Sequence, residues 1–530
     1  MRRLAAAAFA ALAPAAVAAQ GASGPDSSRL VRVVEIRRLN IFSPAEATGF
    51  VTRLANSLHA TTRASVVRRE LLIHPGQPYD SASVAETARN LRALGIFRSV
   101  AIDSVRTDSG LVVRVTTGDG WSTRPDVRLR SAGSSVVFTV ALEELNFLGT
   151  ATLVGAWYRH TPDRSSVTAT FRQPRLFAGQ VGLTALYEDR SDGRRGFAEV
   201  SKPFFSLSTR RSWRVGGDLR RERVLRFFDG SDVARDTLQR RYAVGYGAVG
   251  WALRAGPAGY LRAGLSGQIR RDDYTAEARV DTMGRTISGA LGTFVQWRRA
   301  AYLVSHGFEG LGREEDVDVS TAVGVGLAFT PRAFGYTDDG VVPFVTVETG
   351  FGRPRGFVRL TGTAAGRYTS AGLDSGSVHL AATGYLIPGA RHLATIHGAV
   401  GWQERPAPGA EFDLGLGIGP RAFPQHAFTG DRAFFTTTEY RWTATDSFLN
   451  LTAIGLAGFV DYGGAWYHGE RRRTGWDFGV GLRLGLTRAT EVANTRVDLA
   501  YLVKNDRERG GWVVAVGKGF AFSLNGRLDQ

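Results

Sequence analysis

The stretch FGVGLRLGL, residues 478–486, decides the fold class. Its large apolar residues occupy every second position, and glycine or arginine stands between them. A period of two places the apolar residues on one face of a β-strand and the small or charged ones on the other. The same alternation runs through residues 261–269 and 497–503. In a membrane-spanning barrel the apolar face meets lipid and the polar face lines the lumen, so the pattern predicts such a barrel.

Repeated alternation continues from about residue 136 to the C-terminus, which predicts a barrel domain over 136–530. At about 25 residues for each strand with its loop, the segment holds about 16 antiparallel strands of ~9–11 residues. An even-numbered, closed barrel is therefore expected. A soluble β-sandwich is the alternative, but it buries only one face of each sheet and does not explain an export signal followed by so many aromatic-flanked strands.

Composition excludes several classes. A mean hydropathy of -0.11 is too polar for a bundle of membrane helices. The chain has 65 glycines and no cysteine, so neither a disulfide framework nor a thiolate metal site can form. We expect no cofactor and no metal.

The net charge of +17 raises the question of nucleic acid binding. The excess is almost all arginine, with lysine only at positions 202, 504 and 518, and it is spread along the whole chain. A nucleic-acid-binding arm concentrates its charge in one segment. Solvated loops, a barrel lumen and anionic lipid headgroups are the expected locations of these arginines, and no nucleic acid partner is expected.

The N-terminal residues indicate export. Arg2 and Arg3 precede an alanine-rich apolar run that ends at the small residues Val17, Ala18 and Ala19. This pattern is typical of a secretory signal peptide, assigned here to 1–19, and a polar linker follows at 20–28. No later stretch approaches eighteen consecutive apolar residues, so a β-barrel must form the part that spans the membrane.

A small α+β domain is expected over 29–120, with a second linker at 121–135. Its elements follow the order β-α-α-β-β with one extra helix at 44–58. Periodicity and turn residues place the strands at 30–39, 100–105 and 111–116, with helices near 65–71 and from 81 to 94.

Residues 62–115 of this domain resemble the POTRA family. The segment TRASVVRRELLIHPGQPYDSASVAETARNLRALGIFRSV contains an REL helix end, a G-x-x-Y-D turn and an L-x-x-L-G-x-F-x-x-V join between helix and strand. The resemblance implies that Leu91, Leu94, Phe97 and Val100 form the domain core. The helix at 44–58 has no counterpart in a minimal POTRA domain.

The barrel segment resembles the POTRA-barrel superfamily of outer-membrane assembly factors, which includes Bam- and Tam-type proteins and two-partner-secretion transporters. Four segments carry this resemblance: ELNFLG at 144–149, PRAF at 420–423, TEYR at 438–441 and FVDYG at 459–463. In this superfamily a long loop folds back into the lumen and its arginine meets strand carboxylates. The resemblance implies a latch in which Arg421 pairs with Asp461 and Glu439, with Phe423 and Gly463 beside them.

The sequence departs from the family at two places in the barrel. Ala422 replaces the glycine of the loop tip. The last strand, expected at 511–522, carries Trp512, Phe520 and Phe522 on an apolar face that Lys518 interrupts. A weakly paired closing strand and a lysine at the membrane interface are both compatible with this pattern, and the closing strand is where insertases of the family are thought to open.

No catalytic constellation is found, and we expect a protein that is not an enzyme. The nine histidines are dispersed, and neither G-x-S-x-G nor H-E-x-x-H occurs. His397 and His426 fall near expected loops and are interpreted as ordinary polar surface.

The resemblance implies a bacterial outer-membrane factor for protein insertion or translocation. Its POTRA domain, in the periplasm, would receive unfolded outer-membrane or secreted clients by strand addition. Outer-membrane lipid, lipopolysaccharide and accessory periplasmic proteins are the other expected partners. A passive outer-membrane channel and a surface antigen without assembly activity remain the alternatives. Within the superfamily, two-partner-secretion transporters usually carry two POTRA domains and a plug helix, whereas we expect one POTRA domain and no plug helix in this sequence.

Overall fold

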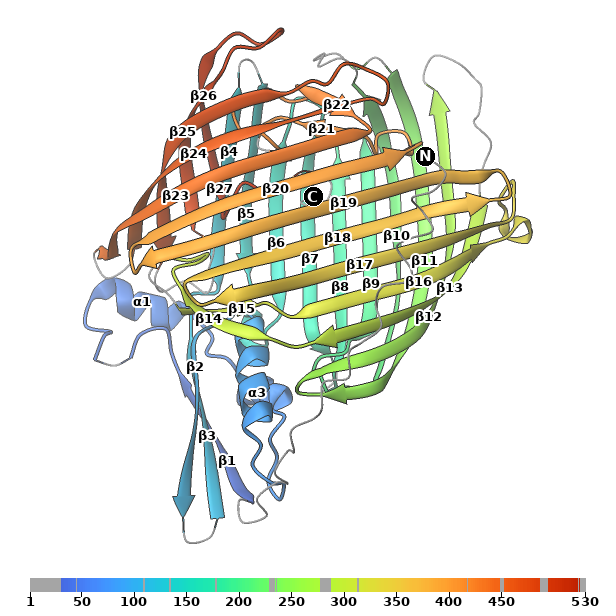
Figure 1. The fold of residues 1–530 in the computed structure, drawn as a ribbon. Coiled ribbons are helices and arrows are strands. Elements are labelled where there is room, and N and C mark those ends of the chain that lie inside the picture. The colour runs from blue at the N-terminus through green and yellow to red at the C-terminus, as the bar shows by residue number, and fades with distance from the viewer. Residues whose placement is uncertain are drawn as a thin grey trace.

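The chain forms a small α+β domain that lies against one mouth of a large β-barrel (Figure 1). In this computed structural model residues 30–524 are described, except 44, 108–109, 133–134, 177–178, 228–233, 235, 277–286, 312–313, 417, 449–451, 487–493 and 523. The expected signal peptide, 1–19, and the linker, 20–28, lie outside the described residues. No helix in the described part is long and apolar enough to cross a membrane.

The small domain has a three-stranded sheet with helices packed on it. Its elements are β1 Val31–Leu39, α1 Phe50–Leu58, α2 Ala64–Glu70, α3 Ser81–Ala93, β2 Phe97–Thr107 and β3 Gly110–Asp119. The sheet order is β1-β3-β2, so β3 is central and runs parallel to β1. The Asp80 carboxylate caps α3 by accepting hydrogen bonds from the backbone N–H groups of Ala82 and Ser83.

The core of this domain contains the four residues expected there. Leu91 and Phe97 are buried, and Leu94 and Val100 pack against them while partly exposed. The extra helix is α1, which is shorter than the expected 44–58. Its residues Phe50 and Leu54, one turn apart, are exposed at 74% and 42%, so they do not belong to that core.

Twenty strands close the barrel, and the expectation of about 16 is corrected by this count of the described strands. They are β4 Thr123–Ala132, β5 Ser135–Glu144, β6 Leu153–His160, β7 Ser165–Leu176, β8 Val181–Arg190, β9 Gly193–Lys202, β10 Arg211–Arg226, β11 Asp236–Gly256, β12 Gly259–Ala276, β13 Ile287–Arg299, β16 Thr321–Thr330, β17 Gly340–Arg353, β18 Gly356–Thr369, β19 Gly372–Gly389, β20 His392–Glu404, β23 Arg432–Phe448, β24 Thr452–Trp466, β25 Gly475–Leu486, β26 Thr495–Leu502 and β27 Gly511–Lys518. More strands fit because several hairpin turns, such as 257–258 and 370–371, are only two residues long.

The barrel also begins earlier than expected. Residues 121–135 were expected to form a linker, but β4 pairs with β5 on one side and with β27 on the other. The barrel domain therefore starts at Thr123 and not at residue 136. The alternation of 123–132 is weak because arginine, proline and serine interrupt it, which is why the sequence suggested a linker.

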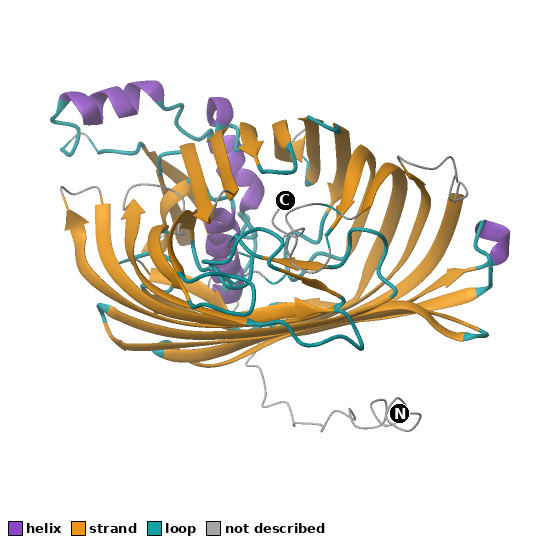
Figure 2. Cartoon of the chain, turned by 90° about the horizontal axis from the view of Figure 1, so that it is seen from above, coloured by secondary structure: helices purple, strands orange, loops and turns teal. Residues whose placement is uncertain are grey.

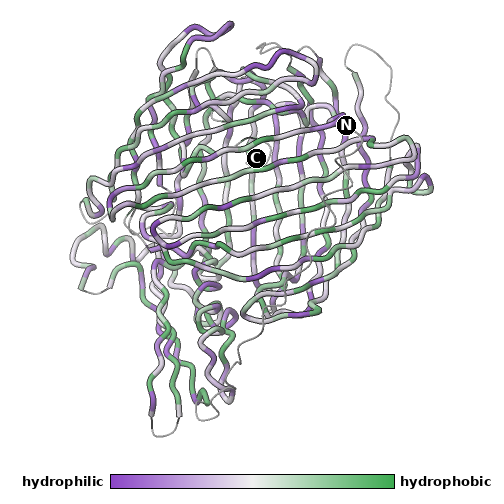
Figure 3. The backbone as a smooth tube through the Cα atoms, in the orientation of Figure 1, coloured by the Kyte–Doolittle hydropathy of each residue, from purple (hydrophilic) through white to green (hydrophobic). Residues whose placement is uncertain are grey.

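The polarity of the barrel is apolar outside and charged inside. On β25, Val480 and Leu482 face outward and are exposed, whereas Arg483 faces the lumen and is buried. Exposed tryptophans lie near both ends: Trp213, Trp251 and Trp297 toward the POTRA side, Trp476 and Trp512 toward the far side. Along the barrel strands the tube in Figure 3 changes repeatedly between green apolar positions and white or purple polar ones. This polarity is that of a barrel that spans a membrane.

Three segments lie inside the ring of barrel strands, where the view from above shows loops and short strands (Figure 2). The first is the long connection at 405–431, here called the lumen loop, which contains β21 Phe412–Leu414 and β22 Phe428–Gly430. The second is the hairpin of β14 Tyr302–His306 and β15 Glu314–Asp318. The third is the part of the C-terminal tail that the structure describes, residues 519–522 and 524.

The C-terminal tail differs from the expected closing strand, which was placed at 511–522. The strand ends at Lys518, and Gly519 follows with φ +60°, a left-handed conformation that favours glycine. Trp512 faces outward as expected. Phe520 and Phe522 instead turn into the barrel, where Phe520 packs on the Arg441 guanidinium at 3.8 Å and Phe522 stacks on His397 at 4.5 Å.

Candidate functional site

Four neighbouring strands place a cluster of carboxylates on the lumen side of the barrel wall. Glu439 on β23, Asp461 on β24, Asp477 on β25 and Asp498 on β26 are all at most 2% exposed. Each occupies the strand face opposite to exposed apolar or aromatic neighbours such as Tyr440. We call these four residues the carboxylate cluster. The alternation of each strand points them into the same space.

Arg421, at the tip of the lumen loop, enters this cluster. Its Nε donates to Asp461 Oδ2 at 2.7 Å, and its Nη2 donates to Asp461 Oδ1 at 3.1 Å. Its Nη1 donates to Asp498 Oδ2 at 3.0 Å and lies 3.5 Å from Glu439 Oε2. The guanidinium also covers the Phe459 ring at 3.6 Å. The fork toward Asp461 is bidentate, a geometry that lysine cannot reproduce.

Further arginines pair with Glu439 and Asp498 of the cluster. Arg483 donates to both oxygens of Glu439, at 3.2 and 2.8 Å, and to Asp498 Oδ1 at 2.6 Å. Arg441 donates to Glu439 Oε1 at 2.5 Å. Because these charges are almost completely buried, each guanidinium depends on its carboxylate partners. Removing one member leaves an uncompensated buried charge, at a cost of roughly 3–5 kcal/mol.

The loop tip is also held by its backbone and by Phe423. The Ala422 N–H donates to Asp477 Oδ2 at 2.9 Å, and the φ of Ala422 is not positive, so alanine fits at this position of the tip without backbone strain. Phe423 is fully buried, and a Cβ on Gly475 would lie 2.1 Å from its ring. Gly463 is similarly crowded, because a Cβ there would approach the Phe434 carbonyl to 2.8 Å. Gly475 therefore makes room for Phe423 of the tip, whereas Gly463 allows the close approach of the neighbouring strand β23.

The structure thus brings Arg421, Phe423, Glu439, Asp461 and Gly463 into one site. The sequence interpretation missed Asp477, Asp498 and Arg483. A signal for them exists: all three occupy the lumen-facing parity of strands whose outward parity is apolar. A charged residue at such a position faces the lumen and needs a partner there.

The first barrel turn binds the POTRA domain to the barrel. Asn146 donates through Nδ2 to Thr62 Oγ1 at 2.9 Å, and the Arg63 N–H donates to the Gly149 carbonyl at 2.9 Å. Asp119, at the end of β3, accepts from the Thr62 N–H at 2.7 Å and lies 2.8 Å from His59 Nε2. The segment ELNFLG therefore has a structural role as the joint between the two domains.

Two helices of the POTRA domain also contact the barrel mouth. Glu70 on α2 accepts from Arg175 Nη2 at 2.7 Å, and Glu86 on α3 accepts from the Leu207 N–H at 2.5 Å. Arg92 on α3 donates to Asp316 on β15 at 2.6 Å. These contacts hold the domain across the mouth that faces it.

His426 joins the lumen loop to the far rim of the barrel. Its Nδ1 lies 2.6 Å from Asp413 Oδ2, its Nε2 lies 3.0 Å from Asp163 Oδ2, and its ring stacks on Phe227 at 3.4 Å. The residue is buried, and so is His397, so the interpretation of both histidines as ordinary polar surface is wrong. Burial disfavours protonation, but the hydrogen bonds and charges of Asp163 and Asp413 outweigh it and raise the pKa of His426 to about 9.

We expect the far end of the lumen loop to loosen at alkaline pH. Because the pKa of His426 is raised above its ordinary value of 6.5, its ionic contribution is complete below about pH 6.5 and is lost as pH rises through about 9. The protonated His426 side chain contributes on the order of 3 kcal/mol to the stability of this end of the loop. A nitroxide on a cysteine introduced at Ala407 should become more mobile between pH 7 and 10. His426→Gln should be mobile at both values, and unchanged mobility of the parent protein at pH 10 would contradict this assignment.

One junction of the barrel is much shorter than the rest. β27 and β4 pair through three residue pairs, Val514 with Ser131, Ala515 with Arg130 and Val516 with Leu129. Every other pair of neighbouring barrel strands shares at least seven residue pairs among the described residues. Lys518, the last residue of β27, lies at the POTRA end of the strand and forms an ion pair with Asp126 of β4 at 3.5 Å. We call this β27–β4 junction the seam.

Comparison with known proteins identifies the small domain. Residues 59–118 match the POTRA family model, described as surface antigen variable number repeat. No curated protein matches the chain by sequence.

Three solved structures are similar to the chain over 93% of its length. CdiB from Escherichia coli is 11% identical with a TM-score of 0.49 and 77% of its own chain covered. CdiB from Acinetobacter baumannii is 9% identical, with a TM-score of 0.42 and 74% covered. The crystal structure of BamA from Haemophilus ducreyi lacking POTRA domains 1–3 is 11% identical, with a TM-score of 0.40 and 84% covered. The family match and the strand pairing together show a POTRA domain joined to a closed antiparallel barrel, as the sequence resemblance predicted, with 20 strands in place of about 16.

Proposed function

We propose that this protein inserts other proteins into a bacterial outer membrane or moves them across it, and that its POTRA domain lies in the periplasm. The observation that carries the proposal is the three-pair seam in a barrel that a POTRA domain adjoins. The mechanism needs no catalytic residue, so we propose a factor that is not an enzyme. Its partners are unfolded outer-membrane or secreted proteins, together with lipid and lipopolysaccharide.

The seam suits strand exchange. A strand edge that loses its partner exposes backbone N–H and C=O groups, which are very costly to leave unpaired in lipid. Because three pairs hold the seam, separating it breaks fewer backbone hydrogen bonds than separating any other described junction. An incoming strand can pair with the freed edges whatever its side chains are, which suits a factor with many clients.

The filled lumen disfavours a passive channel. The lumen loop is anchored in the carboxylate cluster, and the β14–β15 hairpin and the residues that follow β27 pack together in a separate apolar cluster. Phe308 of the hairpin packs near Phe357, Tyr385 and Phe520. A diffusion pore needs an open aqueous path and gains nothing from buried apolar clusters there. A surface antigen needs neither the seam nor the docked domain.

The POTRA domain offers two sheet edges for client strands. Residues 111–115 cannot serve as an edge, because they belong to β3, which is the central strand. The edges are therefore β1 and β2. Clients that add to an edge by backbone hydrogen bonds are recognised with little dependence on sequence. Accessory periplasmic proteins could use the same edges.

Proline substitutions should test the edges. Some residues of β2 between Ala101 and Val105 have backbone N–H groups that point away from β3. Proline at these residues removes a hydrogen-bond donor from the edge without breaking the sheet. We expect several-fold weaker photocrosslinking of an unfolded barrel client with unchanged barrel folding. Proline at equivalent positions of β1 is the second arm, and proline in exposed turn residues is the control. Full crosslinking in both edge variants would contradict strand addition.

The proposed function is tested by reconstitution. Purified protein in lipid vesicles should accelerate the folding of a urea-unfolded outer-membrane barrel, measured by its heat-modifiable mobility on gels. Secretion activity would appear instead as protease protection of a client inside the vesicles. Vesicles that gain only permeability to small solutes, with no effect on either client, would support the passive channel and reject the proposal.

A further inference from the structure

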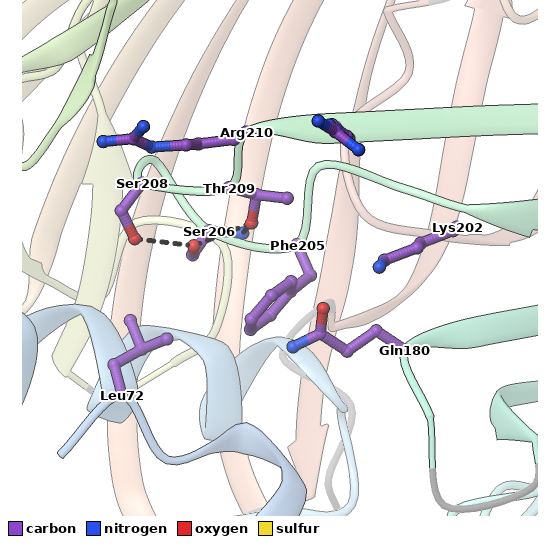
Figure 4. A pocket seen from close by; sticks show the side chains of 9 residues that line it. Leu72, Gln180, Lys202, Phe205, Ser206, Ser208, Thr209 and Arg210 are labelled. Atoms are coloured by element: carbon purple, nitrogen blue, oxygen red, sulfur yellow. Dashed lines mark hydrogen bonds between the residues drawn. The ribbon is translucent and has the colours of Figure 1, made fainter. Parts of the chain in front are cut away.

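A cavity lies where the POTRA domain meets the outer edge of the barrel mouth (Figure 4). Its volume is about 380 Å³. The POTRA domain contributes Leu72, and the barrel contributes Gln180, Lys202 and residues 205, 206 and 208–211 around the β9–β10 turn. Lys202, Gln180 and Phe205 converge on the same space in the figure.

The lining is cationic and lacks any carboxylate. Lys202, Arg210 and Arg211 line the cavity together with the hydroxyl groups of Ser206 and Thr209. None of the three cations forms an ion pair with a carboxylate among the described residues. Elsewhere at this mouth arginines are paired, as Arg175 is with Glu70. Uncompensated cations around a cavity favour an anionic ligand.

The cations lie on the lipid-facing side of the wall. Lys202 of β9 is directly opposite Trp213 of β10, so both point outward, and Arg211 shares the face of Trp213 two residues nearer the POTRA domain. Arg211 in turn pairs with the outward Trp251 of β11. Both tryptophans are exposed. Tryptophan marks the membrane interface, so cations just beyond it meet lipid headgroups.

The turn that carries these residues is held in one conformation. Ser206 Oγ lies 2.8 Å from Thr209 Oγ1, and the Ser206 carbonyl accepts from Arg262 Nη2 at 3.1 Å. The next N–H, that of Leu207, is bound by Glu86 of the POTRA domain. A turn fixed from both sides loses little entropy when a ligand binds.

We propose that this cavity binds the phosphate of an anionic phospholipid from the membrane leaflet on the POTRA side. Lys202 and Arg211 contact the phosphate, and Phe205 and Leu72 cover the glycerol and first acyl carbons. Because Leu72 and Glu86 belong to the POTRA domain, a bound lipid also strengthens its contact with the barrel. The inference rests on the membrane placement proposed above and not on insertion activity. An acidic client peptide fits less well, because the cations face lipid and not the lumen.

Lipid titration of the full-length protein tests the site. Dioleoylphosphatidylglycerol is added to the protein in a neutral detergent, and bound lipid is counted by native mass spectrometry. Dioleoylphosphatidylcholine, whose headgroup is zwitterionic and has no net charge, is the comparison. Each cation should contribute about fivefold in affinity, so Lys202→Gln with Arg211→Gln should weaken binding of the first phosphatidylglycerol by about 25-fold. Arg221→Gln, an exposed arginine on the far half of β10, is the matched control and should leave binding unchanged.

Three outcomes would overturn the proposal. The first is equal binding of both lipids, and the second is equal weakening by the control variant. The third is loss of phosphatidylglycerol binding when inorganic phosphate or an acidic peptide is added at about 10 mM, a concentration at which weak anion binding saturates. No client is present in the titration. A failure here therefore leaves insertion untouched, and a failure of insertion in vesicles leaves the lipid result standing.

Discussion

Arg421→Ala is expected to reduce client insertion by at least tenfold and to destabilise the barrel. The substitution leaves Asp461, Asp498 and Glu439 facing one another with one guanidinium fewer, in a site that water barely reaches. The cost of unpairing a buried charge is roughly 3–5 kcal/mol, and a loss of that size releases the loop tip. Insertion is measured in the vesicle assay, and stability by the temperature at which the folded gel band is lost.

Arg421→Lys separates charge from geometry. Lysine restores one positive charge but cannot form the two parallel hydrogen bonds to Asp461, so an intermediate defect is expected. Arg405→Ala is the matched control, because Arg405 lies in the same loop with a side chain that is 65% exposed. An exposed ion pair contributes only about 0–1 kcal/mol, so this variant should behave as the parent protein does. If Arg421→Ala were as active and stable as Arg405→Ala, the latch would have no function.

Locking the seam with a disulfide is expected to stop insertion, again by at least tenfold, without unfolding the barrel. Ser131 and Val514 are direct partners across the seam, and opposite residues in antiparallel strands have Cα separations of about 4.5–5.5 Å, which a disulfide can bridge. The chain has no cysteine, so Ser131→Cys with Val514→Cys forms a single defined bond. The oxidised protein should be inactive, and a reductant should restore activity.

The control disulfide shares one of the two positions. Leu499 of β26 is the other partner of Val514, and Leu499→Cys with Val514→Cys links two strands that already share eight residue pairs. This bond should leave insertion intact in both redox states. Full activity of the oxidised seam disulfide would show that clients do not pass through the seam. The barrel would then have to act through its lumen, with displacement of the lumen loop.

Local sequence determined the elements and the faces of the strands. The REL helix end, the L-x-x-L-G-x-F join and the Asp80 cap lie within short segments, and they placed the POTRA helices and the core residues Leu91 and Phe97 correctly. A period of two is also local, so the sequence showed that residues such as Val480 face lipid. The latch motif added Arg421 and two of its carboxylates because each lies in a short recognisable segment.

Relations between distant segments were decided only by the tertiary structure. The number of strands depends on where each turn falls and on which strands close the ring, which alternation does not specify. Alternation likewise does not specify that β3 is the central strand of the POTRA sheet. Asp498 reaches Arg421 across 77 positions, and His426 meets Asp163 across 263. Phe520 and Phe522 continue an apolar pattern along the chain, yet the turn at Gly519 sends them into the lumen. Alternation fixes the face that a residue occupies, whereas its partners depend on which strands become neighbours when the barrel closes.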